Sequence, residues 1–201
     1  MLLSVKKRQT YLKELGYYKG EIDGIAGKQT KKAYKDLQND YFTRKKDKDG
    51  VYGTNTDILL RCVYNCKDLK HFKVTEFKCG CKTKYCTGYP VELNVDLLNC
   101  LDDLRGDFGK SITITSGMRC KTHNKKVMGS TGSRHPKGKA VDIFMKTQSS
   151  THKGRKELVD YWIENYSNSR YAYCNGYGRT KSNISYPKSS TMGNAVHIDV
   201  K

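Results

Sequence analysis

Apolar residues recur at intervals of three or four in the first third of the chain. Residues 4–15, 28–41 and 55–66 each carry such a stripe, which predicts three short amphipathic helices. If the three stripes face one another, this segment forms a compact helical bundle. The positions expected to face inward are Val5, Tyr11, Leu12, Leu15, Ala33, Tyr34, Leu37, Tyr41, Ile58, Leu59 and Cys62.

Two of these helices are preceded by the same pattern of residues. Residues 23–30 and 49–56 both read D-G-x-x-G-x-x-T. Asp-Gly favours a tight turn in which the glycine takes a positive φ, and the threonine, or a polar residue just before it, can cap the following helix. The recurrence therefore indicates a duplicated turn–helix unit.

The pattern changes from about His71 onward. Residues 94–105 and 157–166 have helical apolar spacing, whereas residues 111–116 and 195–200 are typical of β-strands. This part of the chain is therefore expected to contain both helices and strands.

Two histidines and an aspartate in this second part are candidate metal ligands. His135 lies in a Ser/Gly-rich loop, Asp142 lies among apolar strand residues, and His197 is flanked by Val196 and Ile198. A carboxylate in an apolar strand is costly unless it has a partner. Two imidazoles and one carboxylate, with a fourth position left open, form a catalytic zinc set that activates water for carbonyl hydrolysis. On spacing alone, a satisfied core histidine and an edge-strand aspartate remain alternatives.

The charge of the chain restricts its partners. Among 201 residues, 38 Lys and Arg outnumber 20 Asp and Glu, which gives a net charge of +18. This excess is spread along the whole chain and implies a polyanionic partner, such as nucleic acid, an acidic membrane or a bacterial wall rich in phosphate polymers. No Cys/His finger spacing and no RNA-recognition signature occurs, so specific nucleic-acid binding is not expected.

The sequence shows no segment that would insert into a membrane. No apolar run approaches the roughly 18 residues needed to span a bilayer. The start, Met1–Arg8, becomes basic before the apolar region of a signal peptide could form. We therefore expect synthesis in the cytoplasm without a signal peptide, so that reaching any other place requires outside help.

The eight cysteines allow several interpretations. An even number would suit four disulfides in an exported protein, but nothing signals export. Cys79, Cys81 and Cys86 have the spacing C-x-C-x4-C, which could hold a structural zinc although it lacks a C-x2-C knuckle. Reduced thiols packed as small apolar side chains are the favoured interpretation, with a disulfide or a second metal still open. The other cysteines are Cys62, Cys66, Cys100, Cys120 and Cys174.

The first segment resembles a known binding module. Residues 4–66 contain Gln9-x-x-Leu12-x-x-x-Gly16-Tyr17-Tyr18, followed by Asp23-Gly24, Gly27, Thr30, Ala33 and Leu37-Gln38. This set is similar to the peptidoglycan-binding domain of bacterial and phage wall hydrolases. The resemblance implies that bacterial peptidoglycan is the partner, and such modules usually accompany a catalytic domain.

The second segment resembles a family of zinc peptidases over roughly residues 71–201. It contains Ser116-Gly117-x-Arg119, Asn124, Gly129, Ser133-x-His135-x-x-Gly138-x-Ala140-x-Asp142-Ile143 and His197-x-Asp199. These residues resemble the zinc D-alanyl-D-alanine carboxypeptidase family, which includes the vancomycin-resistance dipeptidases and many phage L-alanyl-D-glutamate endolysins.

The resemblance carries specific expectations about the site. It implies an α+β fold, a small antiparallel sheet backed by helices, with Zn²⁺ on the sheet face. It implies that His135, Asp142 and His197 bind the zinc, and that Arg119 holds a substrate carboxylate or a polarised carbonyl. A guanidinium suits that task because it can bind a carboxylate through two hydrogen bonds.

One position departs from the family pattern. Many members carry Glu or Asp three residues before the last histidine ligand as the general base, and here that residue is Asn194, whose amide cannot accept a proton at neutral pH. The nearest acid is Asp199, which lies on the same strand face as His197. Asp199 is either the catalytic base or a group that orients a histidine, and the orienting role is slightly favoured.

Two further residues are expected to bind substrate. Ser133 belongs to the family-like loop before His135. Tyr177 has glycine on both sides, which suggests a close backbone approach to a ligand, although it could also be an ordinary turn residue.

These expectations combine into a two-domain protein. Residues 1–68 form a peptidoglycan-binding helical domain, and residues 71–201 form a zinc peptidase domain. We expect a monomeric zinc metallopeptidase that cleaves a stem-peptide bond of the bacterial cell wall, D-Ala-D-Ala or L-Ala-D-Glu, as a phage endolysin does. The alternatives are a non-catalytic wall-binding protein with a structural zinc and, more weakly supported, a basic nucleic-acid binder.

Overall fold

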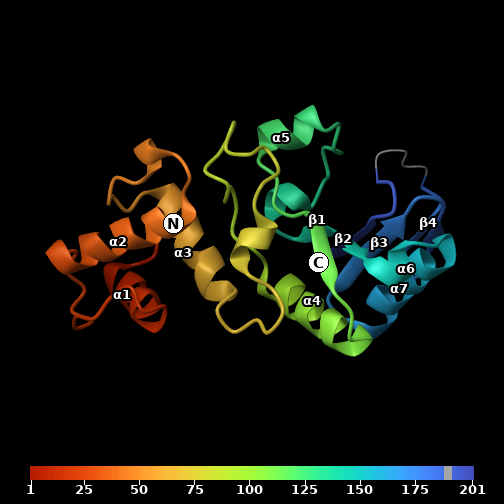
Figure 1. Cartoon of the computed structure of the whole chain (residues 1–201), viewed down its shortest axis with the longest axis horizontal. Helices are drawn as coiled ribbons and strands as arrows, with labels where there is room; N and C mark the ends of the chain where they lie inside the picture. Colours follow the sequence, from red (N-terminus) through yellow and green to blue (C-terminus); the bar gives the residue numbers. More distant parts are fainter. Residues whose placement is uncertain (188–191) are drawn as a thin grey trace.

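The computed structural model describes residues 1–187 and 192–201 of the chain. The N-terminal helices lie at one end of the molecule and the β-sheet lies at the other, with the segment between α3 and α4 running between them (Figure 1). None of the helices in the described residues is long and apolar enough to cross a membrane. The helices are α1 (Val5–Glu14), α2 (Lys28–Tyr41), α3 (Thr54–Asn65), α4 (Val95–Phe108), α5 (Lys121–Lys126), α6 (Lys146–Ser149) and α7 (His152–Asn165), with the 3₁₀ helices η1 (Lys45–Asp47), η2 (Val74–Phe77) and η3 (His135–Lys137).

The three N-terminal helices form a bundle in which α3 packs against both α1 and α2. The two D-G-x-x-G-x-x-T turns of this bundle are held by equivalent buried glutamines. Gln9 accepts a hydrogen bond from the Gly24 N–H at 2.8 Å, and Gln38 accepts one from the Gly50 N–H at 2.7 Å. Each glutamine NH₂ also donates to the aspartate before that glycine. The duplication predicted from the sequence is therefore a duplication of the hydrogen-bond network as well.

The second part of the chain is built on a six-stranded sheet with the order β1-β2-β6-β3-β4-β5. Every neighbouring pair in this order is antiparallel. The α+β fold class is confirmed. The strands are β1 (Ile112–Ser116), β2 (Ala140–Met145), β3 (Ser169–Cys174), β4 (Tyr177–Arg179), β5 (Ile184–Ser185) and β6 (Val196–Val200).

The two faces of the sheet have different roles. In β6, Val196 and Ile198 belong to the apolar core, and α7 packs on this side. The residue between them, His197, lines an open cleft on the other face. The same alternation puts Asp142 on the cleft face of β2, because successive side chains of a strand point to opposite sides.

The helical bundle and the sheet share one continuous apolar cluster, which extends from α1 to β6. Polar contacts also cross between the two parts. The Cys62 thiol donates to the Val91 carbonyl at 3.3 Å, and the Asn65 amide donates to the Leu93 carbonyl at 3.0 Å. Two side chains of α3 thus contact the segment that leads into α4.

The observed elements agree with most of the predicted ones. Helix α2 has the predicted bounds, whereas α7 begins at His152 instead of residue 157 because Thr151 caps it, accepting a hydrogen bond from the Gly154 N–H. The sequence analysis did not predict β3, β4 or β5, whose tyrosine-rich and glycine-rich segments lack a clear alternation.

Candidate metal and active site

Three side chains from separate segments meet on the cleft face of the sheet. His135 lies in η3, Asp142 lies in β2 and His197 lies in β6, and one potential ligand atom from each falls within 4.8 Å of the others. Asp142 and His197 are directly opposite each other in the β2–β6 pairing, which explains the proximity of residues so distant in sequence. The structure therefore brings together the three residues that the sequence predicted as metal ligands.

His135 is held in one orientation by the backbone. Its Nδ1 is 2.7 Å from the Gly117 carbonyl oxygen, which can only accept, so Nδ1 carries the proton. Its Nε2 therefore has a free lone pair, and this atom lies 3.2 Å from Asp142 Oδ1. A histidine whose second nitrogen donates to a backbone carbonyl is typical of metal sites.

His197 is held between two carboxylates. Its Nδ1 is 2.8 Å from Asp142 Oδ1, and its Nε2 is 3.5 Å from Asp199 Oδ2. The ring of Tyr173, directly opposite in the β3–β6 pairing, lies against the imidazole with centroids 4.7 Å apart. Packing against Tyr173 and the contact with Asp199 together fix the ring so that Nδ1 faces Asp142.

The proton affinities of these groups follow from their mutual contacts. Burial alone would favour a neutral Asp142, but its interactions with both histidines outweigh burial and hold the pKa of that carboxyl well below its usual range. Burial lowers the pKa of His135, which favours the neutral imidazole needed of a metal ligand. For His197, burial is outweighed by Asp142 and Asp199, which raise its pKa. Asp142 is thus held ionised between the two imidazoles, as a carboxylate ligand of a cation must be.

Arg119 lies beside this group. Its Nη2 donates to Asp142 Oδ2 at 2.6 Å, and its Nε donates to the Ser116 hydroxyl at 2.9 Å. Ser116 is itself opposite Asp142 in the β1–β2 pairing. The guanidinium is therefore anchored at the edge of the donor set, where it can meet an anionic or polarised group of a bound peptide.

Asp199 is fully buried and has several partners. It forms an ion pair with Arg170, with Oδ1 3.0 Å from the arginine Nε, and Oδ1 also accepts from the Tyr171 N–H at 2.9 Å. Because both of its oxygens already accept hydrogen bonds, this geometry fits a group that orients His197 better than a group that takes a proton from water.

The three candidate ligands line an open cleft of about 1000 Å³. Its other lining residues include Arg119, Ser133, Asn194 and Asp199. Asn194 is exposed, and its Oδ1 accepts a hydrogen bond from Arg155 at 3.0 Å. The amide thus has a structural partner, in keeping with a residue that cannot act as a base.

Tyr177 does not belong to this cleft, so its predicted role in substrate binding is not supported. Its side chain turns toward α7, where its hydroxyl donates to Asp160 at 2.7 Å and Lys156 lies over its ring. The flanking glycines reflect a tight connection between β3 and β4, with Gly176 at a φ of 79°. The tyrosines that do line the cleft are Tyr171 and Tyr173, from the strand that the sequence analysis missed.

Another acid reaches the cleft without having been predicted. Among the described residues, the carboxylates that line it belong to Glu76, Asp142 and Asp199. Glu76 lies in η2, is exposed, and accepts a hydrogen bond from the Lys73 N–H at 2.8 Å. No sequence motif links it to the histidines, since η2 precedes them by a long stretch of chain.

Comparison with protein families agrees with this architecture. Residues 70–183, more than half of the chain, match the model for Peptidase M15, and residues 3–57 match the model for a putative peptidoglycan binding domain. The chain belongs to the M15 peptidases. The matched region contains Arg119, His135 and Asp142, whereas His197 follows it in the sequence. No curated protein gives a significant match to the chain.

M15 peptidases are metal dependent, and the residues of this site fit a metal ion. The donor set of two imidazoles and a carboxylate is one that zinc prefers in catalytic sites. Both histidines have one ring nitrogen fixed by a partner outside the set, Gly117 for His135 and Asp199 for His197, so the other nitrogen is directed at Asp142. The fit rests on these orientations and on the buried anionic charge of Asp142.

Proposed function

We propose that this M15 peptidase is a zinc-dependent enzyme that cleaves a peptide bond in the stem peptide of bacterial peptidoglycan, either D-Ala-D-Ala or L-Ala-D-Glu, and that it serves as a phage endolysin. The observation that carries the proposal is the convergence of His135, Asp142 and His197 in a cleft of a chain that also has a peptidoglycan-binding domain. The basic surface charge favours attraction to a wall that contains anionic polymers.

The residues of the cleft have different roles in the proposed reaction. A zinc ion held by His135, Asp142 and His197 would supply Lewis-acid activation of the scissile carbonyl and of water. Arg119 orients the peptide by binding a carboxylate or carbonyl oxygen, and Ser133 lines the same cleft. Asp199 holds the His197 ring from behind. The general base that accepts a proton from water is then one of the acids that line the cleft, and Glu76 is the exposed one among them.

A second function is favoured by one observation. Asn194 occupies the place where many relatives of this kind carry the general base, and its amide is bonded to Arg155. A chain without a base would be a non-catalytic wall-binding protein with a structural zinc. The two functions differ in whether new chain ends appear in digested peptidoglycan.

The experiment is a digestion of purified bacterial walls by the full-length protein. Enzymatic cleavage releases free amino groups, a chelator added before the digestion prevents this release, and mass spectrometry of the muropeptides identifies the bond. Released D-alanine indicates cleavage of D-Ala-D-Ala, whereas stem peptides with a new N-terminal D-Glu indicate cleavage of L-Ala-D-Glu.

The matched variants are His135→Ala and His152→Ala. His135 is a proposed ligand, whereas His152 is an exposed residue at the start of α7. We expect the first variant to lose both activity and one zinc per chain, and the second to keep both. If the wild-type protein instead binds walls but releases no new amino groups from them, the protein has the non-catalytic function.

A further inference from the structure

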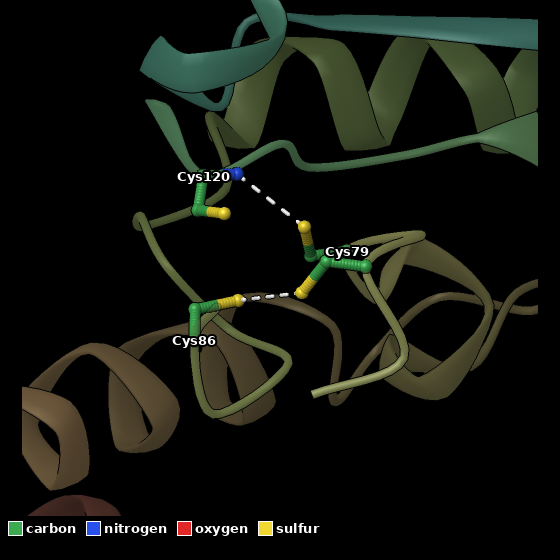
Figure 2. A group of neighbouring side chains, drawn as sticks. Cys79, Cys86 and Cys120 are labelled. Carbon is green, nitrogen blue, oxygen red and sulfur yellow. Dashed lines mark hydrogen bonds between the residues drawn. The ribbon is translucent and has the colours of Figure 1, made fainter. Parts of the chain in front are cut away.

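Four cysteines form a second cluster of potential metal ligands, apart from the histidines. The sulfurs of Cys79, Cys81, Cys86 and Cys120 all lie within 4.8 Å of one another. They come from three places in the chain: the segment after η2, the turns that follow it, and the residue that caps α5. In Figure 2, Cys79, Cys86 and Cys120 turn their sulfurs toward the same small volume.

The spacing of the sulfurs suits a tetrahedral ion. Around a zinc with bonds of about 2.3 Å, tetrahedral sulfurs lie roughly 3.8 Å apart. Here the Cys81 and Cys86 sulfurs are 3.5 Å apart, and none of the eight cysteines, all within the described residues, forms a disulfide. Four thiols packed this closely around one point would repel one another when ionised unless a cation lay between them.

The surrounding backbone points its donors at these sulfurs. The Cys120 N–H donates to Cys79 at 3.3 Å, the Gly88 N–H donates to Cys86 at 3.4 Å, and the His123 N–H donates to Cys120 at 3.4 Å. Amide donors of this kind stabilise thiolates and hold metal ligands in place. The cluster is therefore equipped for charged sulfur and not merely for packing.

The chain between Cys81 and Cys86 also adopts an unusual conformation. Lys82 and Thr83 both have positive φ, at 48° and 63°, and Gly88 follows at 102°. Non-glycine residues rarely adopt this region, and they persist in it only where the surrounding structure holds them there. The tight loop returns the chain so that Cys86 comes to lie beside Cys81.

We propose that Cys79, Cys81, Cys86 and Cys120 bind one structural zinc ion, distinct from the ion at His135, Asp142 and His197. All four protein positions are thiolates, so the coordination is closed and leaves no place for substrate. Binding releases the protons of the thiols that are still protonated, and no oxidant or reductant takes part.

The position of this site gives it a role in shaping the cleft. Cys120 directly follows Arg119, and the Met118 N–H donates to the Phe77 carbonyl at 2.9 Å. A side chain at Gly117 would collide with the Phe77 backbone at 2.4 Å, so the two segments touch. A zinc at the cysteines would fasten the segment after η2 to the turn that carries Arg119 and the Gly117 carbonyl that orients His135.

The test counts metal ions in full-length variants that lack the proposed catalytic ligands. Purified His135→Ala, His197→Ala protein is examined by native mass spectrometry and elemental analysis. We expect it to retain one zinc per chain where the wild-type protein holds two. Adding Cys79→Ser and Cys120→Ser should remove the remaining ion, whereas adding Cys100→Ser, a half-buried cysteine outside the cluster, should not.

A spectroscopic readout covers the case in which the cysteine variants fail to fold. Cobalt exchanged into the His135→Ala, His197→Ala protein should show intense visible d–d bands and thiolate-to-cobalt charge transfer in the near ultraviolet, as four-sulfur sites do. The proposal is overturned if this protein holds no metal and shows no charge-transfer band. It is equally overturned if intact-mass analysis finds Cys81 and Cys86 joined as a disulfide in the protein purified without reductant.

Discussion

Asp199 lies behind His197, with Asp199 Oδ2 at 3.5 Å from the imidazole Nε2, while the opposite ring nitrogen faces Asp142. The two residues are i and i+2 in β6 and so share the cleft face of the sheet. Asp199 also forms an ion pair with Arg170. This arrangement assigns Asp199 to the orientation of His197.

The Asp199→Asn variant tests that role. An amide at this position can no longer accept from the imidazole in the same way, so we expect metal affinity and turnover to fall together by about 10–100-fold. Zinc affinity is measured by competition with a chelator and turnover by amino-group release from muropeptides. Asp160→Asn, which lies on α7 beside Tyr177, is the control and should change neither. A loss of turnover of about 10²–10⁴-fold with zinc affinity intact would show that Asp199 is the general base.

Arg119 should contribute to substrate binding more than to metal binding. Its guanidinium donates one hydrogen bond to Ser116 and another to Asp142, and the single ammonium group of a lysine cannot reproduce this geometry. Loss of a charge-assisted hydrogen bond costs about 1.5–3 kcal/mol, so we expect kcat/KM of Arg119→Lys to fall by roughly 10- to 100-fold. Steady-state kinetics on a soluble muropeptide and zinc analysis together check this.

The control for Arg119→Lys is Arg179→Lys, whose arginine pairs with Asp160 and Glu164 away from the cleft. If Arg119→Lys loses zinc in proportion to its activity, the residue serves mainly to hold Asp142. Unchanged kcat/KM would remove Arg119 from substrate recognition.

The sequence predicted those features that depend on local pattern. Residues 28–41 form α2 as expected because the apolar stripe and the preceding turn both specify it. His135, Asp142 and His197 converge because strand alternation puts the last two on one face. The domain-level resemblance agreed with the family comparison.

Other features depend on contacts that no local pattern contains. Cys120 joins the three earlier cysteines only because η2 packs beneath the turn after β1, so the C-x-C-x4-C spacing looked incomplete. Tyr177 was misplaced because its glycine neighbours specify a tight turn without specifying which face the ring takes. The tyrosine-containing strand β3 was missed because its sequence shows no clear alternation of apolar and polar residues.

The sequence analysis placed the two buried glutamines in the family motif but did not predict their burial or their hydrogen bonds. Gln9 and Gln38 are at most 1% exposed, and each amide meets its turn through several hydrogen bonds. Their burial could not be predicted from hydrophobic periodicity, because periodicity treats a polar residue as a surface residue. Their role follows from the structure and has a measurable consequence.

Replacing Gln38 with alanine should destabilise the N-terminal bundle. The substitution leaves the Gly50 N–H without its acceptor and opens a cavity, so we expect the free energy of unfolding to fall by about 2 kcal/mol. Gln9→Ala should have a similar effect, since it removes the equivalent contacts to Gly24. Gln29→Ala, an exposed position on α2, should change the free energy of unfolding by less than about 0.5 kcal/mol. Chemical denaturation followed by circular dichroism measures all three.

The last prediction concerns the independence of the two proposed domains, residues 1–68 and 71–201. The first segment contains both copies of the turn–helix unit together with the glutamines that hold them, so its hydrogen-bond network is complete within itself. It also packs against the rest of the chain, since Cys62 meets Val91 and the Tyr41 ring lies 6.2 Å from that of Tyr89. We therefore expect residues 1–68 to fold alone with reduced stability and to sediment with purified bacterial walls.

The second segment expressed alone tests whether catalysis is independent of wall binding. Residues 71–201 hold the His135, Asp142 and His197 set, so they should cleave soluble muropeptides at a rate near that of the full chain. Activity on whole walls should fall, because the segment lacks the peptidoglycan-binding domain that raises its local concentration on the substrate. Co-sedimentation over a range of salt concentrations, with the full chain as reference, distinguishes specific wall binding from charge attraction, which salt screens. An unfolded first segment, or one that binds walls at no salt concentration, would show that the two parts act only as one unit.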